Sequence, residues 1–258
     1  MMSSNVLVEV NDLHKVYPSG THALKGVSLN VYEGEFLVVI GLSGSGKTTL
    51  LKCINRLEEP TAGTVKFLGK DITHIKGKEL REVRTQIGMV FQQFNLIKRM
   101  NVLNNVLAGK LGYMKTLPSI LGNFPPQCIE EAMKNLDIVG IREYAYERAD
   151  KLSGGQQQRV AIARSLMQSP KLLLADEPVA SLDPATSNSI MQYFEKVNKE
   201  LGVTVVCNLH FLSLVRRYAS RVIALKSGEI VFEGLPHEID EAWFKKIYGE
   251  EAEEVEIR

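Results

Sequence analysis

The first part of the chain alternates short apolar segments with turn residues. Residues 6–10, 27–31 and 65–67 are rich in β-branched residues, which favours strands. The run 36–40 is apolar throughout, as expected of a central strand that is covered on both faces. A glycine-rich loop follows this run, and apolar residues then recur at helical spacing: Leu50, Leu51, Ile54 and Leu57. The pattern predicts a buried strand, a tight loop and a helix in succession.

From about residue 95 to residue 168 the apolar positions follow a helical period. A stretch that contains proline and glycine, 117–126, divides this region into two amphipathic faces: Val102, Val106 and Leu111, and then Ile129, Met133 and Leu136. We therefore predict a helical block that is inserted into an α/β fold.

Strand–helix alternation resumes after this block. Apolar strands are predicted at 171–175 and 203–207, and 222–225 begins a closing hairpin that turns through Gly228. The helix between the first two of these strands presents one apolar face: Ile190, Met191, Phe194, Val197 and Leu201.

Charge and composition narrow the class of protein. The chain has 258 residues, of which 45% are hydrophobic and 24% are charged, so a sizeable core can be buried. Its 31 Lys and Arg nearly balance its 30 Asp and Glu. A non-specific nucleic-acid binder usually carries a basic excess, so we expect no nucleic-acid partner.

Membrane and redox signals are weak in this sequence. No apolar run reaches the roughly 18 residues of a membrane-spanning helix, and the N-terminal residues lack the pattern of a signal peptide. Any membrane role is therefore expected to come from a partner. The cysteines Cys53, Cys128 and Cys207 have neither zinc-site nor disulfide-framework spacing, which favours a reducing compartment.

The loop after the run 36–40 fits the phosphate-binding pattern G-x-x-x-x-G-K-[ST]. Its glycines let backbone N–H groups turn inward around a β-phosphate, Lys47 can reach the β and γ oxygens, and the Thr48 hydroxyl can ligate Mg²⁺. The N-terminus of the following helix adds a favourable dipole. A flexible turn is the alternative, but the position between strand and helix favours a nucleoside triphosphate site. We assign to it these residues: Gly41, Ser43, Gly44, Ser45, Gly46, Lys47, Thr48 and Thr49.

A later apolar strand ends in two carboxylates, Asp176 and Glu177. An aspartate at a strand end can hold Mg²⁺ opposite the phosphate loop. Glu177 is then placed to act as a general base on a water in line with the γ-phosphate. The alternative is that Glu177 only caps the turn before Pro178. Together with the phosphate loop, the pair predicts hydrolysis of the nucleotide and not binding alone.

A third motif stands between these two, just before an alanine-rich helix: Leu152-Ser153-Gly154-Gly155-Gln156. A serine and two glycines at a helix N-terminus form a second anion-binding nest, although an ordinary helix cap uses the same residues. Because one triphosphate already has a loop around it, a second nest makes sense if it closes on a nucleotide that is held elsewhere. The order and spacing of the three motifs resemble those of the ABC ATPases. That resemblance implies two subunits that sandwich two ATP molecules head to tail.

Single residues extend the resemblance. Gln92, in Val90-Phe91-Gln92-Gln93, resembles the glutamine of this family that touches Mg²⁺ and relays to the membrane subunit. Gln93 is the alternative, but the position of Gln92 directly after the apolar pair Val90-Phe91 favours Gln92.

Three more residues match the family. Asp183 resembles the aspartate of its D-loop, His210 the switch histidine that contacts the γ-phosphate, and Tyr17 the aromatic residue that stacks on adenine. A histidine after a strand can instead be structural, and Tyr17 can simply pack at a strand end. By resemblance, nucleotide contacts are expected from Tyr17, Ser153, Gly154, Gly155, Gln156 and Asp183. His210 and Gln92 are expected to join Glu177 in catalysis, and Gln92 to join Thr48 and Asp176 as a metal ligand.

The resemblance covers roughly residues 6–235 and implies a P-loop NTPase core with an antiparallel β subdomain and an inserted helical subdomain at about 95–168. We expect one ABC ATPase domain over 6–245 and an acidic, solvated tail at 246–258. The family also implies ATP and Mg²⁺ as cofactors, a homodimer of ATPase subunits, two transmembrane permease subunits and, indirectly, an extracytoplasmic substrate-binding protein. The chain would then be peripheral, at the cytoplasmic face of the cell (inner) membrane.

Some stretches resemble the ATPases of phosphonate importers in particular: Asn95-Leu96-Ile97-Lys98-Arg99, Leu111-Gly112-Tyr113-Met114, Asp176-Glu177-Pro178-Val179-Ala180-Ser181 and Asn208-Leu209-His210. The ATPase subunit does not touch the cargo, so other oxyanion importers, or another importer of similar lineage, stay open. A soluble ABC ATPase of DNA repair or translation is the alternative class, and it usually carries a long coiled-coil insertion or two fused ATPase domains. Neither is visible. A P-loop kinase or GTPase is disfavoured by the motif at 152–156 and by the lack of a guanine-reading Asn-Lys-x-Asp stretch.

Overall fold

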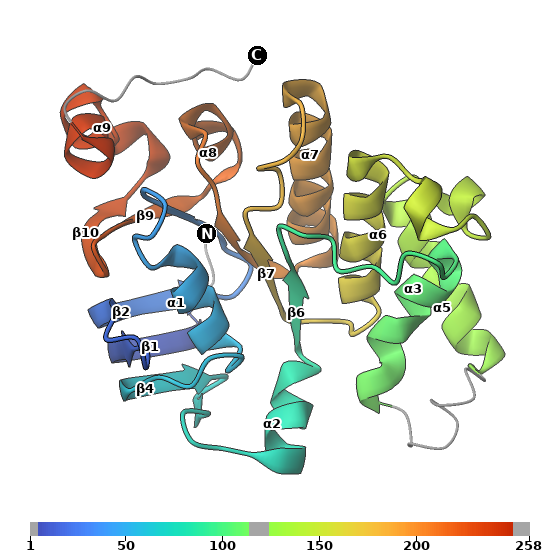
Figure 1. The fold of residues 1–258 in the computed structure, drawn as a ribbon, viewed down its shortest axis with the longest axis horizontal. Helices are drawn as coiled ribbons and strands as arrows, with labels where there is room; N and C mark the ends of the chain where they lie inside the picture. Colours follow the sequence, from blue (N-terminus) through green and yellow to red (C-terminus); the bar gives the residue numbers. More distant parts are fainter. Residues whose placement is uncertain (1–4, 114–123, 250–258) are drawn as a thin grey trace.

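The computed structural model describes residues 5–113 and 124–249, which form two sheets with surrounding helices (Figure 1). Most of the proline- and glycine-bearing stretch 117–126 lies outside the described residues. The same is true of Met114 and of 250–258, which make up most of the expected acidic tail.

The smaller sheet is antiparallel, with the strand order β2-β1-β4-β5. Its strands are β1 (Val6–Val16), β2 (His22–Tyr32), β4 (Ala62–Phe67) and β5 (Lys70–Asp71). β1 and β2 are longer than predicted. The pairing of β1 with β2 shifts register between Val10 and Leu13, and this irregularity interrupts the alternation of apolar and polar positions by which a strand is recognised.

The larger sheet has the order β10-β9-β3-β8-β7-β6, in which β10 is antiparallel and the others run parallel. Its strands are β3 (Phe36–Ile40), β6 (Ile87–Val90), β7 (Leu172–Asp176), β8 (Thr204–Asn208), β9 (Arg221–Lys226) and β10 (Glu229–Gly234). The strands predicted at 171–175 and 203–207 and the hairpin through Gly228 are confirmed to within one residue.

The central strand β3 is buried on both faces. Phe36, Val38 and Ile40 pack into the core on one face of the sheet, and Leu37 and Val39 pack into the core on the other. This is why the run shows no polar residue: parallel strands with helices on both faces have no solvent side.

Helices pack on both faces of the larger sheet, and others form a lobe beside it. The α-helices of the described residues are α1 (Lys47–Ile54), α2 (Gly77–Arg84), α3 (Val102–Leu107), α5 (Pro126–Ile138), α6 (Gly154–Leu166), α7 (Pro184–Leu201), α8 (Leu212–Tyr218) and α9 (Glu241–Tyr248). α3, α5 and α6 pack on one another and form a separate lobe at the right of Figure 1, as expected of the inserted helical block. No helix in the described part of the chain is long and apolar enough to cross a membrane.

The ends of several predicted apolar faces are exposed, namely Leu57 (48%), Leu111 (43%), Ile129 (39%) and Leu201 (47%). α1 stops at Ile54, so Leu57 lies past the helix. Leu111 lies in a 3₁₀ helix at 108–113, whose three-residue turn takes it out of phase with α3. The chain also forms α2, α8 and α9, which were not predicted, and α9 continues past residue 245 into the segment expected to be tail.

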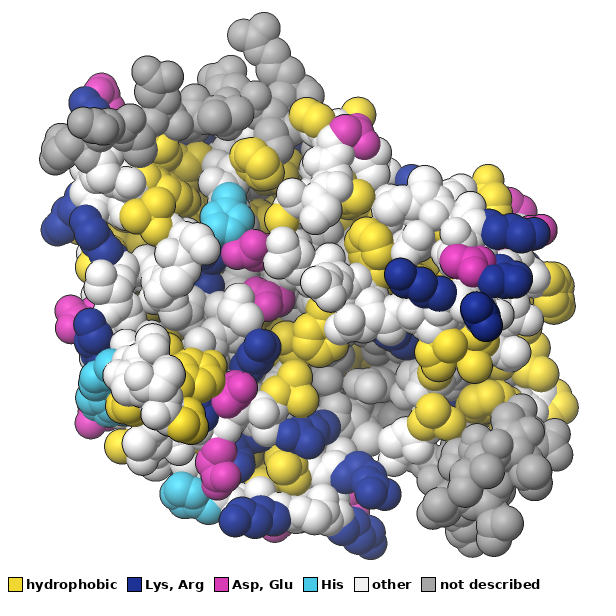
Figure 2. Space-filling view, viewed as in Figure 1, with side chains coloured by type: hydrophobic (Ala, Val, Ile, Leu, Met, Phe, Trp, Pro, Cys, Tyr) yellow, Lys and Arg dark blue, Asp and Glu magenta, His cyan; other side chains and the backbone are white. Residues whose placement is uncertain are grey.

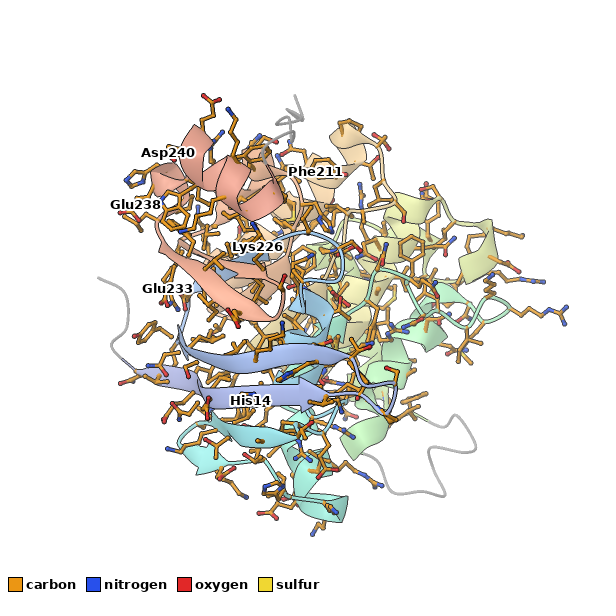
Figure 3. The ribbon with its side chains drawn as sticks, turned by 60° about the vertical axis from the view of Figure 1, so that its left-hand side comes forward. His14, Phe211, Lys226, Glu233, Glu238 and Asp240 are labelled. Carbon is orange, nitrogen blue, oxygen red and sulfur yellow. The ribbon has the colours of Figure 1, made fainter. Side chains whose placement is uncertain are left out.

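The C-terminal helix is tied to the larger sheet. Figure 3 shows the smaller sheet, which carries His14, below the β9–β10 hairpin, with Lys226 between that hairpin and α9. The Nζ of Lys226 donates to the carbonyl oxygen of Lys246 at 2.5 Å. A cation at the last turn of a helix also suits the negative end of its dipole.

Candidate active site

The carboxyl ends of β3, β8, β7 and β6 meet at one edge of the larger sheet, which is where open α/β sheets bind ligands. The phosphate loop follows β3, Gln92 follows β6, Glu177 follows β7 and His210 follows β8. A pocket of about 360 Å³ opens there. It is lined by Tyr17, Thr21, Ala23, Ser43, Gly44, Gly46, Lys47, Thr48, Thr49, Gln92 and Glu177.

Thr21 and Ala23 are pocket residues that the sequence analysis missed. The carbonyl oxygen of Ala23 lies only 2.5 Å from the place where a side chain on Gly46 would begin. Thr21 lies just before β2 and Ala23 near its start, where the chain folds back over the phosphate loop. No local motif marks them, since only the tertiary fold brings them near the loop.

Backbone geometry explains the glycines of the loop. Gly41, Gly44 and Gly46 have φ values of 141°, 77° and 107°, which residues with side chains rarely adopt. A Cβ on Gly41 would also lie 2.2 Å from the carbonyl oxygen of Leu225. Ser45 is buried beside them, and its Oγ has no hydrogen-bond partner among the described residues. Such an unpaired donor inside a phosphate loop fits an anion in the pocket.

Lys47 is buried and is held inside the loop. Its Nζ donates to the carbonyl oxygens of Gly41 at 2.9 Å and Leu42 at 3.0 Å. Burial lowers the pKa of Lys47, while the nearby carboxylates of Glu177 and Asp176 oppose that shift. A triphosphate would offer this cation stronger acceptors than two neutral carbonyl groups.

Asp176 lies beside the loop at the end of β7. Its Oδ1 accepts hydrogen bonds from the Thr48 hydroxyl at 2.8 Å and from the Asn208 amide at 2.7 Å. The structure thus brings together the two expected metal ligands, and Gln92, the third, lines the adjoining pocket, whereas Gln93 does not. Asn208 was not assigned to the site from sequence.

These donors fit Mg²⁺. No cluster of three or more His, Cys, Asp or Glu that could hold a metal occurs within residues 5–113 and 124–249. Mg²⁺ does not need one, because it usually takes one or two carboxylates and completes its shell with water and substrate phosphates. A carboxylate, a hydroxyl and an amide, all oxygen donors, match that preference.

Glu177 occupies the centre of the site. Its backbone has a φ of 49°, which turns the chain sharply after β7. Its Oε1 lies 2.6 Å from the Nε2 of His210 and 3.8 Å from the Nζ of Lys47. An ionised carboxylate only accepts hydrogen bonds, so Nε2 carries the proton in this contact. The carboxylate therefore reaches into the pocket instead of only capping the turn before Pro178.

Tyr17 lies at the other end of the pocket. Its hydroxyl is 3.2 Å from the Oγ1 of Thr49, and the Nζ of Lys15 lies 5.0 Å from the centre of its ring. One ring face is thus occupied by a cation, while the residue still lines the pocket. The ring can receive an adenine there.

The motif at 152–156 does not line this pocket. Ser153 and Gln156 form a capping box at the start of α6: the Ser153 Oγ accepts from the Gln156 N–H, and the Gln156 Oε1 accepts from the Ser153 N–H. Asp183 likewise caps α7, where its Oδ1 accepts from the Thr186 N–H at 3.0 Å. Within one chain these residues are helix caps. A Cβ on Gly155 would lie 2.4 Å from Thr186, so close packing of α6 on α7 also requires a glycine there.

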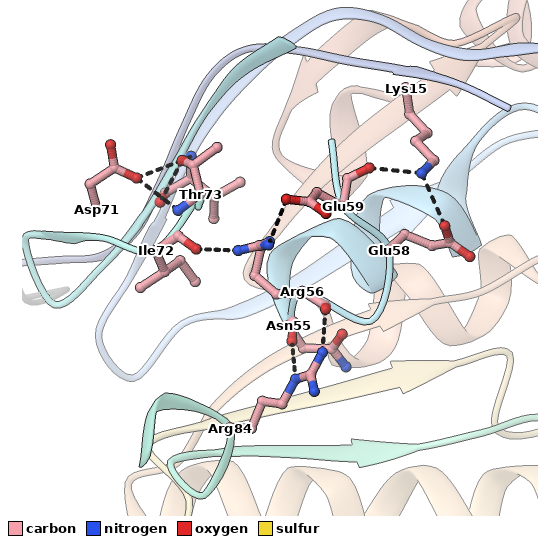
Figure 4. A network of polar contacts seen from close by, with 10 residues as sticks. Lys15, Asn55, Arg56, Glu58, Glu59, Asp71, Ile72, Thr73 and Arg84 are labelled. Atoms are coloured by element: carbon pink, nitrogen blue, oxygen red, sulfur yellow. Dashed lines mark hydrogen bonds and ion pairs between the residues drawn. The ribbon is translucent and has the colours of Figure 1, made fainter. Parts of the chain in front are cut away.

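A polar network anchors the far end of α1 (Figure 4). Arg84 of α2 donates to the carbonyl oxygens of Asn55, at 3.1 Å, and of Arg56. Arg56 donates to the carbonyl oxygen of Ile72 and pairs with Glu59. Because the cations lie at the negative end of the helix dipole, they stabilise the helix whose N-terminus carries the phosphate loop.

Comparison with known proteins gives the same picture. A family model described as "ABC transporter" matches residues 24–180. The phosphonates import ATP-binding protein PhnC of Bdellovibrio bacteriovorus is 58% identical over 256 residues, which cover 99% of this chain and 98% of that protein. The protein of the same name from Bacillus anthracis is 51% identical over 251 residues, 97% of this chain and 98% of that one.

Solved structures agree in fold. CbiO1 of Clostridium perfringens, part of an ABC transporter complex, superposes with a TM-score of 0.81 at 32% identity and covers 94% of both chains. A bacterial ABC transporter cassette in a dimeric structure has a TM-score of 0.77 at 38% identity, with 89% of this chain and 99% of that one covered. The family match spans more than half of the chain and the relatives span nearly all of it, so this protein belongs to the ATP-binding cassettes of the ABC transporter family.

Proposed function

We propose that the chain is the ATP-hydrolysing subunit of a membrane importer whose cargo is phosphonate or a related oxyanion. One observation carries the hydrolytic part: the Glu177 carboxylate reaches into the phosphate-loop pocket, 2.6 Å from His210 and 3.8 Å from Lys47. A carboxylate in that position can accept the proton of an attacking water.

The residues then divide the work as follows. Lys47 exchanges the carbonyl oxygens of Gly41 and Leu42 for oxygens of the β- and γ-phosphates, and the N–H groups of the loop donate to the β-phosphate. Glu177 accepts a proton from the water molecule while the oxygen of that water attacks the γ-phosphate. His210 holds the carboxylate in place through the proton on its Nε2. The products are ADP and inorganic phosphate.

Thr48, Asp176 and Gln92 would hold Mg²⁺. When bound, the ion would neutralise charge on the β- and γ-phosphate oxygens. The Thr48 hydroxyl donates a hydrogen bond to Asp176, so the lone pairs of its oxygen stay free for a cation. Tyr17 receives the adenine on the ring face that Lys15 leaves open.

The active unit is a homodimer. Ser153, Gly154, Gly155, Gln156 and Asp183 lie outside the pocket of their own chain, and a second chain that is docked head to tail would bring them to its nucleotide. The dimeric structure of a 38% identical cassette supports the pairing of two chains.

Two permease subunits complete the transporter, and a groove offers a docking place for them. It measures about 350 Å³, runs between the core and the helical lobe just after Gln92, and is lined by Asn55, Leu57, Arg84, Ile87, Met89, Phe91, Asn95, Ala108, Gly109, Arg164, Ser165 and Gln168. A permease helix in this groove would contact the segment that carries Gln92. Such a helix would also cover the exposed Leu57 and the other large apolar residues that line the groove, Ile87, Met89 and Phe91.

The proposed cargo and cellular location are inferred from the similar proteins. Proteins that are 51–58% identical over nearly the whole chain are named as phosphonate import ATPases. The chain then works as a peripheral subunit at the cytoplasmic face of the inner membrane, with a substrate-binding protein on the other side. Residues 6–245 act as one ATPase domain, with the helical subdomain at about 95–168. On the face seen in Figure 2, acidic and basic side chains both occur, which suits protein contacts better than a nucleic-acid backbone.

Two experiments test this function. Lys47→Ala should abolish binding of a labelled ATP analogue, while Lys52→Ala, a lysine on the same helix outside the pocket, should bind it normally; unchanged affinity in Lys47→Ala would refute the nucleotide site. Cells that lack the chain should fail to grow with a phosphonate as sole phosphorus source, should grow on phosphate, and should be rescued by the wild-type chain but not by Glu177→Gln. Normal growth on phosphonate would refute the cargo.

A further inference from the structure

Asn208 is a buried polar residue at the end of β8, directly after the apolar run Val205-Val206-Cys207. Its neighbours Val206, Cys207 and Leu209 are almost fully buried, and so is Asn208 itself. An apolar residue would be the ordinary choice at such a position, because a buried amide must find partners for both its nitrogen and its oxygen. The presence of an asparagine therefore needs an explanation.

The amide has one polar contact. β7 and β8 are parallel neighbours in which Asp176 and Asn208 are paired residues, so their side chains leave the sheet on the same side. The Asn208 Nδ2 donates to the Asp176 Oδ1 at 2.7 Å. The orientation of the amide follows from chemistry, since a carboxylate accepts hydrogen bonds and only the nitrogen can donate.

The other end of the amide is unsatisfied. The Oδ1 of Asn208 is buried and has no hydrogen-bond partner among the described residues. Leaving a buried acceptor unpaired costs free energy. A buried unpaired group in a folded protein therefore calls for an explanation, such as a role in a functional site. The asparagine therefore does not serve the stability of β8. Among the described residues, its one side-chain hydrogen bond is the contact with Asp176, and we look to that contact for its role.

That contact fixes the carboxylate. The Thr48 hydroxyl donates to the same Oδ1 at 2.8 Å, so two donors from different elements hold one oxygen of Asp176. No hydrogen bond within residues 5–113 and 124–249 reaches the second oxygen, Oδ2. We infer that Asn208 is a positioning residue: together with Thr48 it holds Oδ1 and leaves Oδ2 available as the metal ligand. This inference rests on the proposed magnesium–nucleotide site.

Binding of Mn²⁺ in place of Mg²⁺, followed by electron paramagnetic resonance in the presence of ADP, tests the inference without turnover. Asn208→Leu keeps the size, removes the donor and also removes the unpaired oxygen. Its Mn²⁺ affinity should fall about tenfold or more, as is typical when a residue that orients a metal ligand is lost. ADP affinity in EDTA should stay within about twofold of wild type, because no contact of Asn208 reaches the phosphate loop except through Asp176 and Thr48.

The matched control is Asn135→Leu. Asn135 is also a buried asparagine with a weak partner, the Met167 sulfur, but it lies in the helical lobe. The Asn135→Leu substitution should leave the Mn²⁺ affinity unchanged. In ATPase assays, Asn208→Leu should need about tenfold more Mg²⁺ for half-maximal rate, with kcat largely recovered at saturating Mg²⁺. A purely structural role would instead lower the melting temperature without this shift.

The outcomes separate the two proposals. If the folded Asn208→Leu variant binds Mn²⁺ as tightly as wild type, the role of Asn208 is refuted while the ATPase site stands. If wild type itself shows no ADP-dependent Mn²⁺ binding, the proposed site is refuted first. Should Asn208→Leu fail to fold, Asn208→Ala, which cannot clash, takes its place in the same titration with the same expected tenfold loss.

Discussion

The Glu177 Oε1 and the His210 Nε2 lie 2.6 Å apart, although 33 residues separate them in the sequence. Two features of the fold produce this contact. β7 and β8 are adjacent parallel strands, so the residues just after them emerge at the same edge of the sheet. The left-handed backbone of Glu177, with a φ of 49°, then turns its carboxylate toward the pocket. The residue proposed as base is thus held by a donor from the next strand.

Glu177→Gln should bind ATP with nearly wild-type affinity but should lose turnover by about 10²- to 10⁴-fold. The amide oxygen can still accept from His210, and the size is kept, but no group remains to take the proton of water. Phosphate release and equilibrium binding of ATP measure the two effects. Glu131→Gln on the helical lobe is the control, with expected normal turnover. A Glu177→Gln variant that hydrolyses ATP at the wild-type rate would contradict the role of the base.

Thiol reactivity should follow burial. Burial raises the pKa of Cys53 to about 12 and that of Cys207 well above its usual value. Since the thiolate is the reactive form, both should stay largely unmodified by iodoacetamide at pH 8 in the folded protein. Cys128, which is partly exposed on α5, should be alkylated first. Mass spectrometry of timed samples gives the order, and labelling of Cys53 as fast as Cys128 would contradict the packing around α1.

A buried ion pair should matter for stability. The Arg221 guanidinium contacts both carboxylate oxygens of Glu35, which is 2% exposed, at 2.6 and 3.0 Å. Arg221→Met leaves that carboxylate buried without its cation, with only the Tyr32 N–H as donor among the described residues, and should lower the free energy of unfolding by about 3–5 kcal/mol. Urea unfolding measures the change.

Two comparisons sharpen that result. The double variant Arg221→Met/Glu35→Leu should recover much of the loss, because no unpaired charge is then buried. Lys199→Met breaks an exposed pair with Glu195 and should cost about 0–1 kcal/mol. Equal losses from Arg221→Met and Lys199→Met would show that burial of the pair has no energetic weight.

Sequence reasoning worked where function and local structure use the same residues. The phosphate loop joins a strand that is apolar on both faces to a helix, so pattern and motif locate Lys47 and Thr48 together. Glu177 could be assigned because it follows the strand-end aspartate in a chain that already shows a phosphate loop, whereas His210 needed family resemblance as well, because a histidine after a strand has several uses.

The residues that were missed depend on tertiary neighbours. Thr21 and Ala23 reach the pocket because β2 folds over the loop, and Asn208 meets Asp176 only through the pairing of β7 with β8. Arg84 was missed for the same reason: α2 is too polar to predict from periodicity, yet it caps the end of α1. Apolar periodicity also misjudged helix ends: α1 stops at Ile54, before Leu57, and Leu201, the last residue of α7, is exposed.

The sharing of each active site between two chains is the central claim, and a mixed dimer tests it most directly. A Lys47→Ala chain is paired with a Ser153→Arg chain, with Glu177→Gln on both so that bound ATP is retained. If Ser153 serves the partner's nucleotide, both lesions fall in one site and the other site is whole. Homodimers of either variant should then retain no ATP, while a purified mixed dimer should retain one ATP per dimer. Mixed dimers of verified composition that retain no ATP would contradict the account.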